Sequence, residues 1–252
     1  MAFFSRKSSP VILDNNVNTH FWSWQMSSTK FTLLCSVLFV VLYNTAFFKA
    51  LHTALPIENA KSALFFFSVS LLVGAVTALV LSFIVLPKIS KPVMAFIFIA
   101  AAGVSYFMNA YGIVIHQTMI QNTIETDTNE ASGLFNSTLA LYIFLLGIIP
   151  SVLLFKVKLN FSNFKNEAWN KLKLWGAILL AIVILIAPLT AEYASFFRNH
   201  KTIRQMANPV NFIYASISYI SASNKSITVK PIGEDAKLNE QAKAQTKPIL
   251  FV

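Results

Sequence analysis

Three polar side chains in the middle of the chain have the types and the spacing to bind a charged group. Asn122, Thr126 and Glu130 follow one another at intervals of four residues. On an α-helix these positions share one face, so an amide, a hydroxyl and a carboxylate would form a single polar stripe. The carboxylate can pair with an ammonium group, and the amide and the hydroxyl can hydrogen-bond to a phosphate ester. The stripe is therefore a candidate binding site.

A purely structural interpretation of the same segment stays open. Asp127 and Glu130 are three residues apart, which is the spacing of a capping box at the start of a helix. In that case both carboxylates would be solvated and would stabilise the next helix instead of binding a ligand.

A second polar segment follows after residue 193. Arg198, Lys201 and Arg204 recur every three residues, and Phe196 and Phe197 lie beside them. This pattern predicts a helix that lies in a membrane interface, with its cations toward phosphate head groups and its aromatic rings toward acyl chains.

The remaining residues point to no catalytic centre. The four histidines are scattered, without partners at metal-ligand spacing, at His20, His52, His116 and His200. With only 7 glycines, the chain has no glycine-rich loop to hold a phosphate. We therefore expect no catalytic residue, no metal site and no cofactor in this chain.

Five long apolar runs without a charged residue must position these groups. Each is close to the roughly 20 residues that a helix needs to cross a bilayer, and only helices or closed barrels satisfy their backbone groups there. The runs do not alternate as barrel strands do, so the predicted fold class is an all-α membrane protein with five transmembrane helices. The runs are Phe31–Phe48, Ala63–Leu86, Val93–Ile115, Leu134–Phe155 and Leu174–Ala191.

The net charge of +10 follows this topology and does not indicate a nucleic-acid partner. Basic residues gather in alternate loops, which places the amino terminus in the cytoplasm and the carboxyl terminus outside. They are Arg6, Lys7 and Lys30 before the first run, Lys88 and Lys91 after the second, and Lys156, Lys158, Lys165, Lys171 and Lys173 after the fourth. The polar stripe then lies at the outer leaflet, where a lipid head group could carry both an ammonium and a phosphate.

The composition divides the chain into two parts. Residues 1–220 form the predicted membrane domain, which includes periplasmic interfacial helices and ends with a short helix from Pro209 through Tyr219. Residues 221–252 form a polar linker that ends in Pro248–Val252, which has the pattern of the first strand of a further domain.

Several segments resemble the membrane domain of the lipid A phosphoethanolamine transferases, bacterial inner-membrane enzymes of the polymyxin-resistance type. The resemblance is carried by Tyr106–Ile115, Met119–Asp127, Tyr193–Lys201 and Asn208–Ile213. One departure is His116, where the family pattern leads us to expect an acidic residue. The resemblance implies a multi-pass protein of the bacterial inner membrane.

The resemblance also implies a reaction and its partners. Such enzymes move phosphoethanolamine from phosphatidylethanolamine to lipid A through a threonine of a Gly-Glu-Thr motif, in a zinc-holding alkaline-phosphatase-like α/β domain. That domain would follow Val252 and is absent from these residues, so we expect a truncated chain that is inactive by itself. Asn122, Thr126 and Glu130 match positions that help to form the donor pocket in the family, and other membrane phospholipids are expected partners.

Two other functions stay open. A related transferase could use another head group, such as phosphoglycerol. A transporter or channel is disfavoured because none of the five runs contains Asp, Glu, Lys, Arg or His, the residues that usually mark ion pathways.

The charge pattern makes a prediction about topology. A reporter that is active only in the periplasm should be active when it is fused after Tyr219 and inactive when it is fused after Lys165, because basic loops stay in the cytoplasm. Reporter activity measured in intact cells checks this, and the reverse pattern would contradict the orientation.

Overall fold

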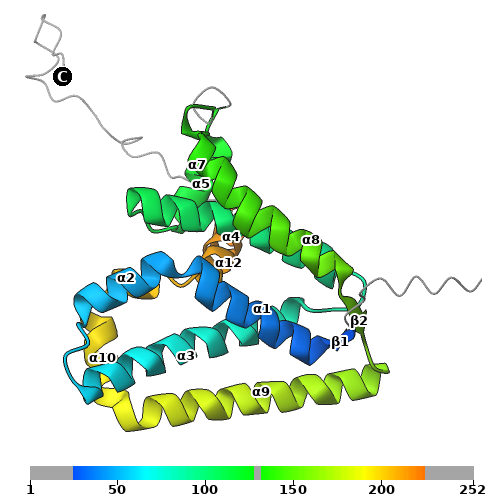
Figure 1. Ribbon diagram of the computed structural model, residues 1–252, viewed down its shortest axis with the longest axis horizontal. Coiled ribbons are helices and arrows are strands. Elements are labelled where there is room, and N and C mark those ends of the chain that lie inside the picture. The colour runs from blue at the N-terminus through cyan, green and yellow to red at the C-terminus, as the bar shows by residue number, and fades with distance from the viewer. Residues whose placement is uncertain (1–24, 128–131, 225–252) are drawn as a thin grey trace, which may run out of the picture.

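The computed structural model describes residues 25–127 and 132–224, and nearly all of its ordered elements are helices (Figure 1). This confirms the predicted all-α class. The helices are α1 Ser28–Tyr43, α2 Thr45–Ala54, α3 Ala60–Ile84, α4 Ser90–Tyr111, α5 Gln117–Glu125, α7 Ser137–Tyr142, the π-helical η1 Ile143–Ile148, α8 Ile149–Lys156, α9 Phe164–Ile186, the 3-10 turn η2 Ala187–Leu189, α10 Thr190–Asn199, α11 Lys201–Arg204 and α12 Val210–Ser223. Two short strands, β1 Gln25–Ser27 and β2 Lys158–Asn160, pair in parallel.

The described residues contain four helices that are long and apolar enough to cross a membrane, or five if one bent pair is counted. The four are Ala60–Ile84, Ser90–Tyr111, Ser137–Lys156 and Phe164–Asn199. The predicted first span is a bent pair in the structure, because α1 and α2 meet at an angle of 63°. Asn44 is the one strongly polar side chain in this apolar run, so the hydropathy of the run does not indicate a bend.

Asn44 forms the bend by hydrogen bonding to a distant part of the chain. Its side-chain Nδ2 donates to the carbonyl of Phe39 at 2.9 Å and to the carbonyl of Asn208 at 2.6 Å. Its Oδ1 accepts from the backbone N–H of Asn208 at 2.9 Å, and the Asn208 side chain donates to the carbonyl of Ala101 at 2.9 Å. Both asparagines are almost fully buried, so these bonds satisfy backbone groups that water does not reach. We call this pair the asparagine clamp.

The core beside the clamp is aromatic. The ring of Phe39 on α1 stacks on Phe98 of α4, with centroids 4.7 Å apart. The hydroxyl of Tyr43 donates to the carbonyl of Leu146 in η1. A π-helical turn interrupts the usual backbone ladder, and here it presents a carbonyl to α1. Gly147 lets η1 approach α4, since a Cβ there would be 3.1 Å from the Cα of Ile99.

The fourth and fifth spans begin at other residues than the apolar runs predict. The fourth begins at Ser137, after Asn136 accepts the backbone N–H of Leu139 at 2.8 Å and so caps α7. The helix of the fifth span begins at Phe164, not at Leu174, and continues through η2 into α10. Pro209 precedes α12 as its N-cap instead of being its first residue. The interfacial segment after residue 193 is thus a direct extension of the fifth span.

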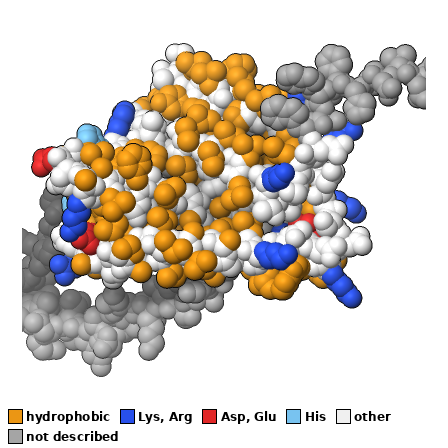
Figure 2. All heavy atoms as spheres, turned by 60° about the horizontal axis from the view of Figure 1, so that its bottom comes forward, with side chains coloured by type: hydrophobic (Ala, Val, Ile, Leu, Met, Phe, Trp, Pro, Cys, Tyr) orange, Lys and Arg blue, Asp and Glu red, His pale blue; other side chains and the backbone are white. Residues whose placement is uncertain are grey.

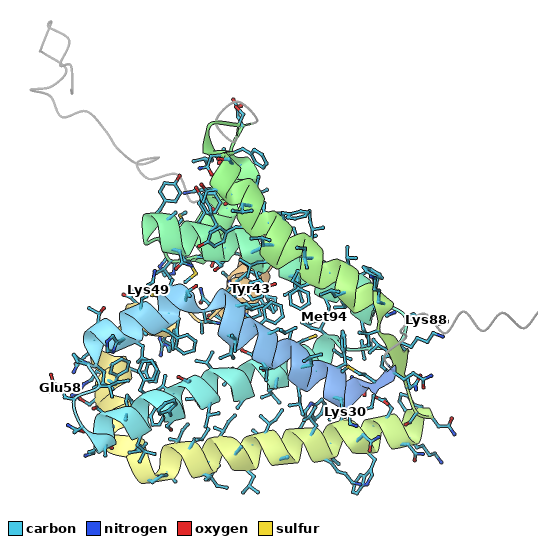
Figure 3. All side chains as sticks on the ribbon, viewed as in Figure 1. Lys30, Tyr43, Lys49, Glu58, Lys88 and Met94 are labelled. Atoms are coloured by element: carbon cyan, nitrogen blue, oxygen red, sulfur yellow. The ribbon has the colours of Figure 1, made fainter. Side chains whose placement is uncertain are left out.

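The loops that were predicted on one side of the membrane do lie at the same end of the bundle. Lys30 and Lys88 lie near the two strands, and Lys49 and Glu58 lie at the opposite end (Figure 3). Figure 2 shows a broad apolar surface between two charged ends. Because side chains such as Phe67 and Phe96 are 64% exposed on helices of this length, the apolar surface fits contact with acyl chains.

The asparagine clamp predicts a loss of stability on substitution. Asn44→Ala should lower the free energy of unfolding by about 1–3 kcal/mol, because it removes the side-chain partner of the buried carbonyl and N–H of Asn208. Unfolding of the purified protein in a denaturing detergent measures the change.

Asn163→Ala is the matched control, since Asn163 is exposed and its side chain makes no cap hydrogen bond. Equal stabilities of the Asn44 and Asn163 variants would show that the clamp does not support the fold.

Candidate functional site

The end of the bundle opposite the strands gathers the polar residues that the sequence singled out. It is built from the carboxyl end of α4, from α2 and α5, and from α10 to the start of α12 (Figure 1). We call it the amide end, after Asn109, Asn122, Asn136 and Asn211. The opposite end, with the two strands, is the lysine end.

The carboxyl end of α4 sets the geometry of the amide end. Gly112 has a left-handed backbone with φ of 66°, and its N–H donates to the carbonyl of Met108 at 3.1 Å. Glycine adopts this conformation without the steric penalty of a side chain, so the chain can leave α4 sharply toward α5.

Asn109 is a polar residue of this end that sequence analysis missed. Its half-buried side chain donates to the carbonyl of Ser105 at 2.7 Å and lies 3.3 Å from the hydroxyl of Thr45 on α2. The amide therefore links α4 to α2. Its only signal in the sequence is its place within the segment Tyr106–Ile115.

Helix α5 lies on the surface and is held at its start by α12. The side chain of Asn211 donates to the carbonyl of Ile115, just before α5, at 2.6 Å. Ile120 and Phe212 pack against one apolar cluster with Met108. None of the residues of α5 is buried, so most of the helix is free to meet a ligand.

Two residues of the predicted three-residue stripe lie in the described structure. Helix α5 ends at Glu125, and Thr126 is its C-cap with an extended backbone, so Thr126 is not on the helix that carries Asn122. The stripe as a binding site stays a prediction. The structure does bring Asn122 and Thr126 together, since the Thr126 hydroxyl donates to the Asn122 carbonyl. Glu130 lies outside the described residues.

The described residues include another carboxylate beside Thr126, that of Glu125. Gln121 donates to Glu125 at 2.9 Å, one turn apart on the exposed surface of α5. Glu125 does not fit the four-residue spacing of the predicted stripe, so the sequence pattern did not indicate it. The capping interpretation of Asp127 depends on Glu130 and so stays a prediction. The cap of α7 is Asn136, whose side chain also donates to the hydroxyl of Tyr106 at 2.7 Å.

The cationic segment lies on α10 and α11 in the same end. Arg198, Lys201 and Arg204 are all exposed, as the interfacial pattern predicts. The predicted contact of Phe196 with acyl chains is wrong, because its ring is only 7% exposed and lies 5.5 Å from the ring of Phe65 on α3. The helix turns this aromatic face inward, and its position then depends on protein packing.

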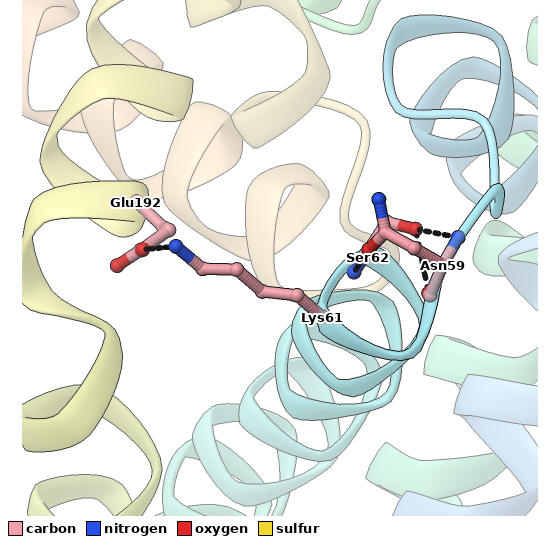
Figure 4. A network of polar contacts seen from close by, with 4 residues as sticks. All are labelled: Asn59, Lys61, Ser62 and Glu192. Atoms are coloured by element: carbon pink, nitrogen blue, oxygen red, sulfur yellow. Dashed lines mark hydrogen bonds and ion pairs between the residues drawn. The ribbon is translucent and has the colours of Figure 1, made fainter.

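Two further contacts attach α10 to α3. The hydroxyls of Ser68 and Tyr193 are 2.7 Å apart, and both residues are buried. Lys61 pairs with Glu192 at 2.6 Å, next to the capping box of Asn59 and Ser62 that begins α3 (Figure 4). The ion pair is solvent-exposed, so it orients the helices more than it stabilises them.

The chemistry that these groups support is binding. Amide, hydroxyl and guanidinium groups can hydrogen-bond to phosphate, and carboxylates can pair with an ammonium. Among residues 25–127 and 132–224, no three His, Cys, Asp or Glu side chains come close enough to hold a metal ion. The described part of the chain thus has the features of a membrane-embedded domain with polar groups gathered at one end.

Comparison with known proteins identifies this domain. The family described as phosphoethanolamine transferase EptA/EptB matches residues 73–223, which is more than half of the chain. The chain therefore belongs to the EptA/EptB phosphoethanolamine transferase family and corresponds to its amino-terminal membrane domain.

Individual relatives agree with this assignment. The chain is 30% identical to phosphatidylethanolamine transferase Mcr-1 of Escherichia coli over 93% of its own length and 44% of the relative's. It is 29% identical to Mcr-2 of the same species, covering 92% and 44% of the two lengths. It spans less than half of these curated relatives.

A solved structure shares the fold. The integral membrane lipooligosaccharide phosphoethanolamine transferase A (EptA) of Neisseria meningitidis superposes with a TM-score of 0.75 at 25% identity. The match covers 79% of this chain and 37% of that one. The helical arrangement described above is thus that of the membrane part of a phosphoethanolamine transferase.

Proposed function

We propose that the chain is the membrane anchor and lipid-substrate-binding domain of a transferase that moves phosphoethanolamine from phosphatidylethanolamine to lipid A. The observation that carries this proposal is the family match over residues 73–223. That range includes α4, α5 and α10 to α12, which together with α2 build the amide end.

The amide end is suited to a phosphoethanolamine head group, which carries a phosphate diester and an ammonium. Asn122 and Thr126 lie one turn apart and can serve the phosphate, while a carboxylate of this segment, Glu130 or Glu125, can pair with the ammonium. The exposed Arg198, Lys201 and Arg204 would meet the phosphates of lipid A or of surrounding phospholipids.

The orientation of the chain follows from charge. The segments of the lysine end, residues 25–31, 85–95 and 155–175, contain eight lysines and one acidic residue, Glu167. Short basic segments stay in the cytoplasm, so the amide end would face the periplasm of a bacterial inner membrane.

The transfer step itself would be carried by the part of the transferase that these residues do not include. Zinc there would polarise a phosphoryl oxygen and activate a threonine nucleophile. The membrane domain would hold and orient the lipids.

The head-group assignment predicts specific losses of activity. With this domain in a full-length transferase, Asn122→Ala, Thr126→Ala and Glu130→Ala should each lower the transfer rate per folded molecule about 10- to 100-fold, because a misplaced donor reacts slowly. Transfer to lipid A from phosphatidylethanolamine vesicles, measured by mass spectrometry, checks this.

Thr123→Ala is the matched control for Thr126. Both hydroxyls donate to the carbonyl four residues earlier, so loss of that bond affects both variants alike.

Asp127→Ala tests the capping interpretation, under which activity would only follow the amount of folded protein. Unchanged rates for Asn122, Thr126 and Glu130 variants would remove the assignment. Transfer from phosphatidylglycerol alone would indicate another head group.

The division of labour predicts that the 252-residue chain by itself neither modifies lipid A nor binds zinc stoichiometrically. Elemental analysis of the purified chain and a lipid A modification assay in cells check the two statements. One zinc per chain, or modified lipid A, would place catalytic groups within these residues.

A further inference from the structure

The lysine end contains a pocket that the transfer reaction does not use. Its volume is about 410 Å³, and it lies between the turn that joins α3 to α4 and the strand β2. Its lining combines cationic, polar and apolar side chains. The lining residues are Lys88, Ser90, Lys91, Lys158, Leu159, Asn160 and Phe161.

The three lysines reach the pocket from two elements that are far apart in the sequence. Lys88 has a left-handed backbone, with φ of 73°, a conformation that is unfavourable for a residue with a side chain. Lys91 donates to the carbonyl of Phe155 at 3.1 Å, which holds its ammonium group at the carboxyl end of α8. Lys158 is placed by the parallel pairing of β2, where it is opposite Gln25. The fold therefore concentrates positive charge in one hollow.

The positive charge of the pocket is not neutralised from within the described structure. Glu167 is the one acidic residue in the three segments of this end, and it is nearly buried. Its carboxylate accepts from the hydroxyl of Ser28 and from the backbone N–H of Ser162 at 3.3 Å. Lys171, one helical turn after Glu167, instead donates to the carbonyls of Ser82 and Val85 at 3.0 and 2.7 Å. A pocket whose lining has three lysines and no carboxylate favours an anion.

The surroundings of the pocket indicate an anion with an acyl chain. Leu86, Ile89 and Phe155 flank the lining residues in the sequence and are 41%, 47% and 54% exposed. A soluble phosphate would leave these apolar side chains unused, while a phospholipid would cover them with its chains. Basic pockets between the ends of transmembrane helices are typical sites for anionic head groups.

We propose that this pocket binds the phosphate diester of an anionic phospholipid from the leaflet at the lysine end. Lys88, Lys91 and Lys158 pair with the phosphate, and the lipid chains lie along Leu86 and Phe155. The site is at the opposite end from the donor head group, so it stands or falls independently of the proposed transfer function. A bound lipid would link the α3–α4 turn to the α8–β2 junction.

The test uses the purified full chain and native mass spectrometry of lipid adducts. Lipid titrations compare phosphatidylglycerol with zwitterionic phosphatidylcholine. The wild type should prefer phosphatidylglycerol. The variant Lys88→Gln, Lys91→Gln, Lys158→Gln should bind phosphatidylglycerol at least about 10-fold more weakly, because each lysine near an anionic head group contributes separately.

The matched control is Lys156→Gln, Lys165→Gln, Lys173→Gln, which removes the same charge from exposed positions of the same end outside the pocket. It should bind within about twofold of the wild type, since exposed charges more distant from the lipid are screened. Replacing the three pocket lysines by arginine should retain binding. This result would show that the glutamine variant binds more weakly because it lacks the positive charges.

Several results would overturn the proposal. Equal losses in the pocket and control variants would mean general attraction to this end, not a site. A wild type without preference for phosphatidylglycerol would contradict it directly, whether or not the variants fold. Binding of glycerol 3-phosphate as tight as that of phosphatidylglycerol would make the ligand a soluble anion and exclude the lipid.

Discussion

The buried pair Asn44 and Asn208 is the constraint on which the arrangement of this bundle depends. Side chain and backbone of the two residues exchange hydrogen bonds, and Asn208 adds a bond to α4. The bend of 63° between α1 and α2 and the turn before α12 are therefore one unit. Since water and lipid offer no replacement for these bonds, the bend persists where a run of apolar residues would otherwise continue straight.

This bend places both polar parts of the amide end. Phe47 and Leu51 of α2 share one apolar cluster with Tyr193 and Phe196, which fixes the cationic segment on the bundle. A second cluster joins Met108 to Met206, at the turn between α11 and α12, and to Ile120 of α5. The groups suited to binding head groups thus rest on protein packing. Their exposed charged side chains lie on helices that these apolar clusters hold in place.

The two ends of the domain differ in chemistry as well as in charge. The amide end combines amides, carboxylates and guanidinium groups, and it lies in the range that matches the EptA/EptB family. The lysine end carries ammonium groups in excess around a pocket. Under the two proposals above, the domain would contact lipid head groups at both ends, and the apolar band between the ends would lie among acyl chains.

The sequence by itself determined the class of protein, the number of apolar runs and which loops lie at the same end of the bundle. These follow from composition and from the solvent properties of the bilayer, which act on each segment separately. Only the tertiary structure decided the bend at Asn44, the end of α5 before Thr126 and the inward face of Phe196. The bend at Asn44 and the inward face of Phe196 each depend on a partner that is distant in the chain. Local pattern carries no information about such partners, because hydrogen bonds and ring contacts form only once the helices have packed.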